Sequence, residues 1–427
     1  MNAHSAAAPR TSNLASVMTV GLLFFIFGFV TWLNGPLITF VKLAFDLDDI
    51  NAFLVPMAFY LSYFFLALPA SWILKRTGMK KGMSLGLFVM AAGALAFGQF
   101  ATMRVYPGAL TGLFVIGAGL SLLQTAVNPY ISILGPIESA AQRIAVMGIC
   151  NKTAGILAPL VLGALVLRGI GDLAEKVGQA DAATKQALLN DFAAKIHLPY
   201  LAMAVLLALL AVWVLRSSLP EVDAAEVNSG DGATSDSRSS IAQYPHLWLG
   251  VLCLFVYVGV EVMAGDAIGT YGQGFHLPLD ETKFFTAFTL TAMLVGYLAG
   301  LVTIPRFISQ ERYLAVSAVL GVVFTLGAFL SKGYVSVGFV AALGFANAMM
   351  WPAIFPLAIR GLGRFTELGS AFLIMGIAGG AVIPQAFAHL KSHYDFQAVF
   401  CALMLPCYLY IFYYAVRGYA AGTRRAA

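Results

Sequence analysis

The sequence predicts an all-α polytopic membrane protein that crosses the bilayer twelve times, in two pseudo-repeated six-helix bundles. Apolar residues make up 60% of the chain and charged residues only 11%, against about 25% charged in soluble proteins. The apolar residues fall in long runs separated by short polar segments, which is typical of a membrane protein with many spans. One long polar stretch near the middle divides these runs into two sets of six.

Each apolar run is long enough to cross the hydrocarbon core, which takes about 20 helical residues. The first run follows Arg10 and has no small-residue cleavage site after a short apolar core, so we interpret it as a retained span rather than a signal peptide. The predicted spans are, in order, 15–42, 50–74, 82–102, 108–134, 141–167, 198–216, 246–273, 284–304, 313–331, 334–360, 367–390 and 396–418.

Two polar segments organise the chain outside the membrane. Residues 216–245 are rich in Ser, Gly and Asp, the composition of a flexible linker. We therefore predict an N-terminal bundle over residues 1–215 and a C-terminal bundle over 246–427, joined by a cytoplasmic linker. The second segment, 169–198, has an Ala-, Lys- and Leu-rich pattern that predicts a short amphipathic helix.

The basic residues predict that both termini face the cytoplasm. An even number of spans puts the termini on one side, and this placement puts most basic residues inside, including Lys75, Arg76, Lys80 and Lys81 between the second and third spans. Cytoplasmic loops of membrane proteins carry an excess of Lys and Arg. We therefore interpret the net charge of +5 as a topology signal and not as a nucleic-acid-binding surface.

The two halves repeat one another. Residues 126–131 of the fourth span are echoed by residues 349–354 of the tenth, and each is followed by a basic loop and a Gly-rich span with a late proline. A tandem repeat of six-span units places a substrate site near the membrane midplane, between the halves.

Three charged residues fall inside predicted spans. Glu261 and Asp266 lie in the seventh span and Lys152 lies in the fifth. A charge at bilayer depth costs roughly 2.5–3.5 kcal/mol on insertion scales, so it persists mainly where function uses it. Their spacing puts the two carboxylates about 140° apart on a helix, unless the Gly265 region distorts it.

We predict that Lys152 pairs with Glu261 or Asp266 across the two halves. Such a pair would break when sugar or an ion binds. Occupancy of the substrate site would then be linked to the rocking movement of one half against the other. The alternatives are a purely structural ion pair and a lysine that extends into a water-filled cavity.

Residues 123–136, Leu-Gln-Thr-Ala-Val-Asn-Pro-Tyr-Ile-Ser-Ile-Leu-Gly-Pro, form the most specific motif in the chain. Together with residues 151–155, 351–363 and 369–380, the motif resembles the fucose/glucose/galactose symporter family of the major facilitator superfamily over both halves. Residues 147–152, Met-Gly-Ile-Cys-Asn-Lys, are more similar to the glucose/galactose members. The resemblance implies the major facilitator fold and uptake of a monosaccharide by cation-coupled symport with alternating access.

The chain departs from the fucose-type members of that family at two places. Those members carry an acidic residue late in the first span and another in the fourth-span motif, where this chain has Asn34-Gly35 and Gln124. If a carboxylate carries the coupling ion, Glu261 and Asp266 are the in-membrane candidates. A lone carboxylate suits a proton, whereas two oxygens with unwound carbonyls near Gly265 suit a sodium ion.

A sugar offers hydroxyl groups and one apolar face, so its site needs amides or carboxylates and an aromatic ring. Trp32, Tyr271 and Trp351 are candidate aromatic platforms. The alternative for the amides is hydrogen bonding between helices, and for the tryptophans it is packing. The candidate substrate-binding residues are Asn34, Gln124, Asn128, Asn151, Asn347, Trp351 and Gln385.

The predicted function is import of a hexose such as glucose or galactose across a bacterial inner membrane, by a protein that works in the lipid bilayer as a monomer. The alternatives are an N-acetylglucosamine or fucose symporter, an uncoupled sugar facilitator, and a transporter-like sugar receptor. An enzyme acting on lipid-linked sugars is disfavoured, because two carboxylates on one helix give it little support. No nucleotide-binding loop or zinc spacing occurs in the sequence, so we predict no cofactor and no metal site.

Overall fold

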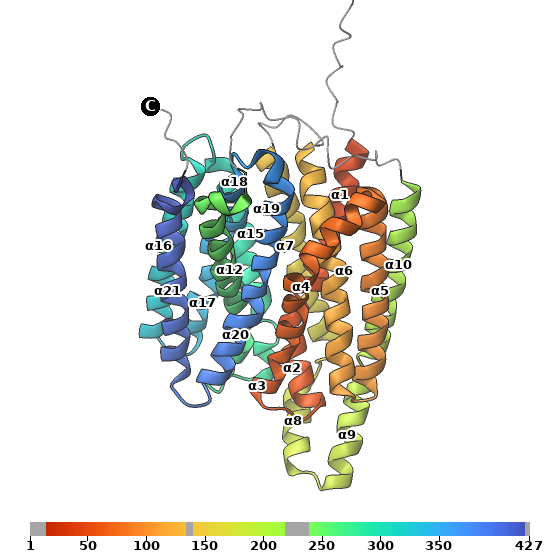
Figure 1. Cartoon of the computed structure of the whole chain (residues 1–427). Helices are drawn as coiled ribbons and strands as arrows, with labels where there is room; N and C mark the ends of the chain where they lie inside the picture. Colours follow the sequence, from red (N-terminus) through yellow and green to blue (C-terminus); the bar gives the residue numbers. More distant parts are fainter. Residues whose placement is uncertain (1–13, 134–139, 218–238, 423–427) are drawn as a thin grey trace, which may run out of the picture.

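The structure is a computed structural model that describes residues 14–133, 140–217 and 239–422. The described residues form two helical bundles that stand side by side (Figure 1). In the N-terminal half the helices are α1 (Leu14–Thr31), α2 (Asn34–Ala44), α3 (Asp49–Ala52), α4 (Leu54–Thr77), α5 (Met79–Thr102), α6 (Tyr106–Ile133), α7 (Ala140–Leu165), α8 (Ile170–Gln179), α9 (Ala182–Ala194) and α10 (His197–Arg216).

The C-terminal half repeats this organisation. Short 3-10 turns lie at Ile241–Gln243, Gly363–Phe365, Gly376–Ala378 and Gly418–Ala420. The α-helices are α12 (Pro245–Gly265), α13 (Ile268–Gln273), α14 (Leu279–Thr282), α15 (Phe285–Thr303), α16 (Gln310–Leu330), α17 (Gly333–Asn347), α18 (Met350–Ile359), α19 (Thr366–Met375), α20 (Gly379–Leu390) and α21 (Phe396–Val416).

The predicted membrane fold is confirmed. The described residues contain twelve helical segments that are long and apolar enough to cross a membrane. Most of the predicted linker, 218–238, lies outside the described residues. The predicted single helix within 169–198 is instead two, α8 and α9, because Ala180 and Asp181 are extended and Asp181 occupies the cap position of a new helix.

Five of the predicted spans are interrupted and not continuous. The first breaks between Thr31 and Asn34, the second at Phe53, the seventh between Gly265 and Ile268, and the tenth and eleventh break near Ala348 and Gly376. In the first and tenth spans a proline lies in the first turn of the second helix, where its missing N–H costs nothing. Interrupted spans matter because ligands of membrane proteins commonly bind at such breaks.

The largest helix contacts between the two halves involve α4 and α7 of the N-terminal half. Helix α4 packs against α19 and α20, and α7 packs against α15; Figure 1 shows the first of these contacts near the centre of the molecule. At the end of the molecule that carries the α8–α9 hairpin, Asp49 contacts Lys42 and Lys391. We call these three residues the Asp49 cluster, and Lys391 is its only member from the C-terminal half.

Further polar contacts join the halves at both ends. At the hairpin end, Lys283 donates to the carbonyl oxygen of Leu167 (2.8 Å), and Asp280 accepts from the backbone N–H of Gly171 (3.0 Å). At the opposite end, Glu367 of α19 accepts a hydrogen bond from Ser71 of α4 at 2.7 Å. Contacts at both ends therefore enclose the region near the middle of the bundle.

Several close helix contacts depend on glycine, and two of them are especially tight. Gly28 of α1 lies against α7, where an added Cβ atom would lie 1.9 Å from the carbonyl oxygen of Asn151. Gly379 of α20 lies against α12, and an added Cβ atom would lie 1.8 Å from the oxygen of Phe255. Both distances are far below van der Waals contact, so only glycine lets these backbones approach so closely.

We expect Gly28→Ala to lower the free energy of unfolding by about 1–3 kcal/mol, the usual cost of forcing an extra carbon into a packed site. Helix α1 must then move away from α7, the helix that carries Asn151. The thermal unfolding midpoint of the purified protein measures the effect. Gly338→Ala is the matched control, because a Cβ atom there meets nothing within 4 Å. Equal midpoints for the two variants would contradict the prediction.

Candidate functional site

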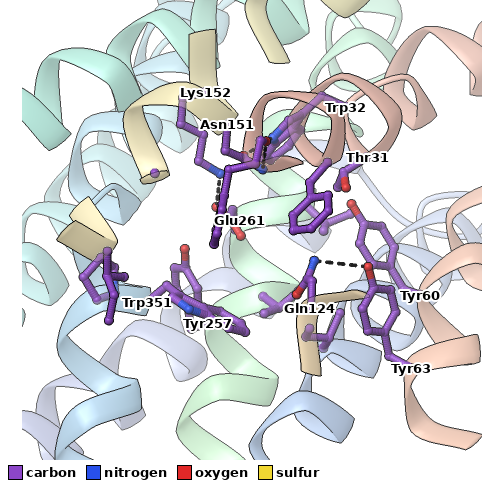
Figure 2. A pocket seen from close by; sticks show the side chains of 18 of the residues that line it. Thr31, Trp32, Tyr60, Tyr63, Gln124, Asn151, Lys152, Tyr257, Glu261 and Trp351 are labelled. Carbon is purple, nitrogen blue, oxygen red and sulfur yellow. Dashed lines mark hydrogen bonds and ion pairs between the residues drawn. The ribbon is translucent and has the colours of Figure 1, made fainter. Parts of the chain in front are cut away.

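A polar cavity of about 120 Å³ lies between the two halves. The interrupted first span, α4, α6 and α7 form one wall, and α12, α15, α18 and the turn at Gly376–Ala378 form the other (Figure 2). The lining residues are Phe24, Phe27, Thr31, Trp32, Tyr60, Tyr63, Gln124, Ile144, Gly148, Asn151, Lys152, Tyr257, Val258, Glu261, Val262, Tyr297, Trp351, Pro352 and Ile377.

An ion pair crosses the cavity from one half to the other. Lys152 Nζ on α7 lies 2.9 Å from Glu261 Oε1 on α12, and the two side chains are 8% and 12% exposed. The ammonium also lies 4.5 Å from the ring centroid of Trp32, within range of a cation–π contact. Of the two carboxylates predicted as partners of Lys152, the structure places Glu261 beside it and not Asp266.

Two of the predicted amides line the cavity. Asn151 accepts a hydrogen bond from Trp32 Nε1 and donates to the carbonyl oxygen of Phe24, both at 3.4 Å. Gln124 donates to the hydroxyl of Tyr63 at 3.3 Å. All three hydrogen bonds are long for an amide, so the Asn151 and Gln124 side chains are available to a ligand. The side chain of Asn128 lies outside the described residues.

The two tryptophans have different surroundings. Trp32 is 2% exposed and is held between Gly155 and Gly265, where added Cβ atoms would lie 2.5 and 2.4 Å from the indole ring. Trp351 lines the cavity and stacks on Phe355 with ring centroids 5.9 Å apart. Trp351 is therefore the better placed of the two to offer a ring face to a sugar.

Four other predicted residues do not line the cavity. Asn34 donates to the carbonyl oxygen of Thr31, and Gln385 donates to that of Ile50. Asn347 is fully buried and accepts a hydrogen bond from Tyr408, and Tyr271 is fully buried beside Ser336. These contacts are interhelical or local, so a direct sugar contact by Asn34, Asn347, Gln385 or Tyr271 stays a prediction that needs another conformation.

Tyrosine hydroxyls in the cavity were not anticipated from the sequence. Tyr60 and Tyr63 lie three residues apart on α4, so they share one face of the helix, and Tyr257 and Tyr297 come from the other half. The spacing of Tyr60 and Tyr63 was the available signal, but the same spacing is common in helix packing. The four side chains add hydroxyl donors and acceptors to the cavity lining.

Asp266 lies outside the cavity, at the break between α12 and α13. It is 2% exposed, and its Oδ2 atom accepts a hydrogen bond of 3.2 Å from Tyr60 in the other half. Its Oδ1 atom has no hydrogen-bond partner among the described residues. Gly35, at the start of α2, approaches so closely that an added Cβ atom would lie 3.3 Å from Oδ1.

Two carbonyl groups at this break accept hydrogen bonds from side chains. Thr286 donates to the oxygen of Gly265 at 2.8 Å, and Thr289 donates to that of Ala264 at 2.6 Å. Both hydroxyls come from α15 and both side chains are buried. These two oxygens are therefore not free to coordinate a cation in this conformation.

A twelve-span bundle whose halves enclose a polar cavity at interrupted helices defines a membrane transport protein. The chain belongs to the Major Facilitator Superfamily, whose family model matches residues 20–384. This finding confirms the fold and the superfamily that the sequence motifs predict.

Relatives of the chain cover nearly its whole length. It is 32% identical over 421 residues to a glucose/galactose transporter of Brucella abortus, with 97% of each chain covered. It is 29% identical over 379 residues to the L-fucose-proton symporter of Escherichia coli, which covers 87% of this chain and 85% of that protein. The crystal structure of the transporter FucP in its outward conformation matches with a TM-score of 0.75 at 26% identity, over 95% of this chain and 98% of the other.

Proposed function

We propose that the protein imports a hexose, glucose or galactose, together with a proton, by alternating access. We place it in a bacterial inner membrane as a monomer with both termini in the cytoplasm, as the distribution of Lys and Arg favours. The observation that carries the proposal is the cavity between the halves, crossed by the Lys152–Glu261 ion pair. Relatives named as glucose/galactose and fucose transporters support a sugar as the substrate.

The chemistry of the cavity suits a sugar. Amides and tyrosine hydroxyls can both donate and accept, which matches the hydroxyl groups around a pyranose ring. The Trp351 ring supplies an apolar surface for the face of the sugar that carries C–H groups. Sugar hydroxyls bound to Glu261 would compete with Lys152, and so would weaken a contact that holds the halves together.

The surroundings of the two carboxyl groups favour a proton over a sodium ion. Two of the backbone oxygens at the α12–α13 break accept hydrogen bonds from Thr286 and Thr289, which leaves fewer ligands for sodium, an ion that needs several oxygens. Asp266 is buried, and the Tyr60 hydroxyl is its side-chain hydrogen-bond partner, so its carboxyl group can take one proton but offers few oxygens to a sodium ion. A relative named as an L-fucose-proton symporter points the same way.

The test is uptake of labelled sugar into proteoliposomes under an inward proton gradient, an inward sodium gradient and no gradient. We expect accumulation of glucose or galactose only with the proton gradient. Fucose and N-acetylglucosamine belong in the same panel, because a fucose symporter is among the relatives. Equal and non-accumulating uptake in all three conditions would establish a facilitator and contradict the proposed coupling.

Glu261→Gln is expected to reduce accumulation to the level of liposomes without protein. Glutamine keeps the shape of the side chain but removes the charge, so Lys152 loses its ion-pair partner inside the membrane. Glu175→Gln is the matched control, because Glu175 is exposed on α8 and the charge change is the same. Accumulation by Glu261→Gln at the level of the control would assign Glu261 a structural role only.

A further inference from the structure

Tyr60 of α4 lies between the polar cavity and Asp266. Its side chain is among those that line the cavity, and its hydroxyl donates to Asp266 Oδ2 at the end of α12 in the other half. The side chain is only 3% exposed. Figure 2 shows Tyr60 and Tyr63 together on one wall of the cavity, on the side away from Trp351. One side chain therefore contacts both of the places where ligands are proposed to bind.

The carboxyl group of Asp266 has few partners. Its Oδ1 atom accepts no hydrogen bond among the described residues, and the Thr286 hydroxyl of α15 donates to a backbone oxygen instead. The charged groups that face it are Glu261, on the same helix, and Lys152, from α7. These two are paired with each other, so Tyr60 is the side chain that bonds directly to Asp266.

We propose that Tyr60 is the positioning residue that links sugar binding in the cavity to proton binding at Asp266. The inference rests on the proton-coupled uptake proposed above. A charged Asp266 depends on the Tyr60 hydroxyl, because the other donor beside it is the backbone N–H of Gly35 and a buried carboxylate with few donors is costly. When a proton adds to Oδ1, the group becomes neutral, and the Tyr60 O–H is free to rotate and donate to a sugar hydroxyl. The proton stays on Asp266 until it leaves for the solvent, and no other covalent bond changes.

This arrangement makes the two ligands favour each other. The coupling between two sites is reciprocal, so a proton at Asp266 strengthens sugar binding by the same factor by which sugar strengthens proton binding. Couplings of this kind are typically about 5–150-fold. We therefore expect the wild-type protein to bind glucose more tightly at mildly acidic than at mildly alkaline pH, by a factor in this range.

Tyr60→Phe tests the link, with glucose as the probe and the full-length protein in proteoliposomes and in detergent. We expect the variant to exchange internal for external sugar, to lose proton-driven accumulation, and to bind glucose with an affinity that no longer depends on pH. Tyr63→Phe is the matched control. Tyr63 lines the same cavity from the same helix, but its hydroxyl bonds to Gln124 and not to Asp266. The glucose affinity of Tyr63→Phe should therefore keep the wild-type pH dependence.

The outcomes separate this inference from the proposed function. A pH dependence of glucose affinity in Tyr60→Phe equal to that of the wild-type protein would overturn the role of Tyr60 and leave proton-coupled uptake intact. Failure of the wild-type protein to accumulate sugar with a proton gradient would overturn both. If Tyr60→Phe does not fold, Asp266→Asn is the variant that tests the inference. It should exchange sugar with a pH-independent affinity, and a wild-type pH dependence in that variant would overturn the inference.

Discussion

Lys152→Ala is expected to abolish sugar accumulation and to destabilise the protein by about 3–5 kcal/mol, the usual effect of removing one partner of a buried ion pair. The cause is the partner that remains. Glu261 is 12% exposed, and its Oε1 atom lies 2.9 Å from the lysine ammonium. Without that cation, a carboxylate is left inside the bundle with no opposite charge beside it, and the cation–π contact with Trp32 is lost as well.

Two further variants separate stability from transport. The double variant Lys152→Ala/Glu261→Ala removes both charges and should recover much of the lost stability, because no unpaired ion remains. It should still fail to accumulate sugar if the pair links occupancy to movement of the halves. Lys75→Ala is the control for removing a lysine, since its contact to Glu367 is 3.5 Å long and the side chain is 59% exposed. An exposed pair of this kind contributes about 0–1 kcal/mol.

The measurements are the thermal unfolding midpoint and the ratio of internal to external sugar at steady state. We expect the midpoints to rank Lys152→Ala lowest, then the double variant, with Lys75→Ala near the wild type. If Lys152→Ala accumulates sugar with unchanged proton dependence, the result would refute the functional role of the Lys152–Glu261 pair. The lysine would then be a side chain that simply reaches into the cavity, one of the alternatives that its sequence position allows.

The twelve spans were predictable because the bilayer imposes one length on every crossing helix, and composition alone reveals runs of that length. The breaks within spans were not. Pro36 and Pro352 mark two of them, but prolines also occur inside continuous helices here, as Pro69 and Pro159 show. A proline signals a possible break, and the surrounding tertiary contacts decide whether the helix is interrupted there.

For the site, the sequence indicated which residue types to look for but not their partners. Lys152 and Glu261 stand out because charge in a span is rare, yet they are 109 positions apart, and only packing of α7 near α12 selects Glu261 over Asp266. The same limit applies to Asn347 and Gln385. An amide in a span satisfies either a ligand or a neighbouring helix, and its residue type does not distinguish the two.

Asp49→Asn is expected to open the hairpin end of the bundle. Asp49 holds Lys42 of its own half at 2.6 Å and also contacts Lys391 of the other half. Gln385 and the pair Phe53–Phe387 pack beside this cluster and join the same two halves. Asparagine keeps the size of the side chain but leaves two ammonium groups facing one neutral amide, so an attraction between the halves becomes a repulsion.

The burial of Lys391 increases the effect. Burial lowers the pKa of its ammonium group, and the charge of Asp49 acts in the opposite direction. Without Asp49, the lysine must lose its proton or move towards the solvent, and either change removes the contact between the halves. The contacts of Asp280 and Lys283 remain at the same end. We therefore expect a shift of about tenfold in the population of the open form, equivalent to ~1.4 kcal/mol, and not complete opening.

Spin labels at Val105 and Tyr394 measure this opening. Both side chains are exposed at the hairpin end, one in each half, and the four native cysteines can be replaced beforehand. Asp46→Asn is the matched control, because Asp46 lies at the same end but pairs with Lys185 of its own half. The distance distribution should broaden towards longer values in Asp49→Asn alone. Identical distributions in the two variants would show that the Asp49 cluster does not hold the halves together, and would transfer that role to the contacts of Asp280 and Lys283.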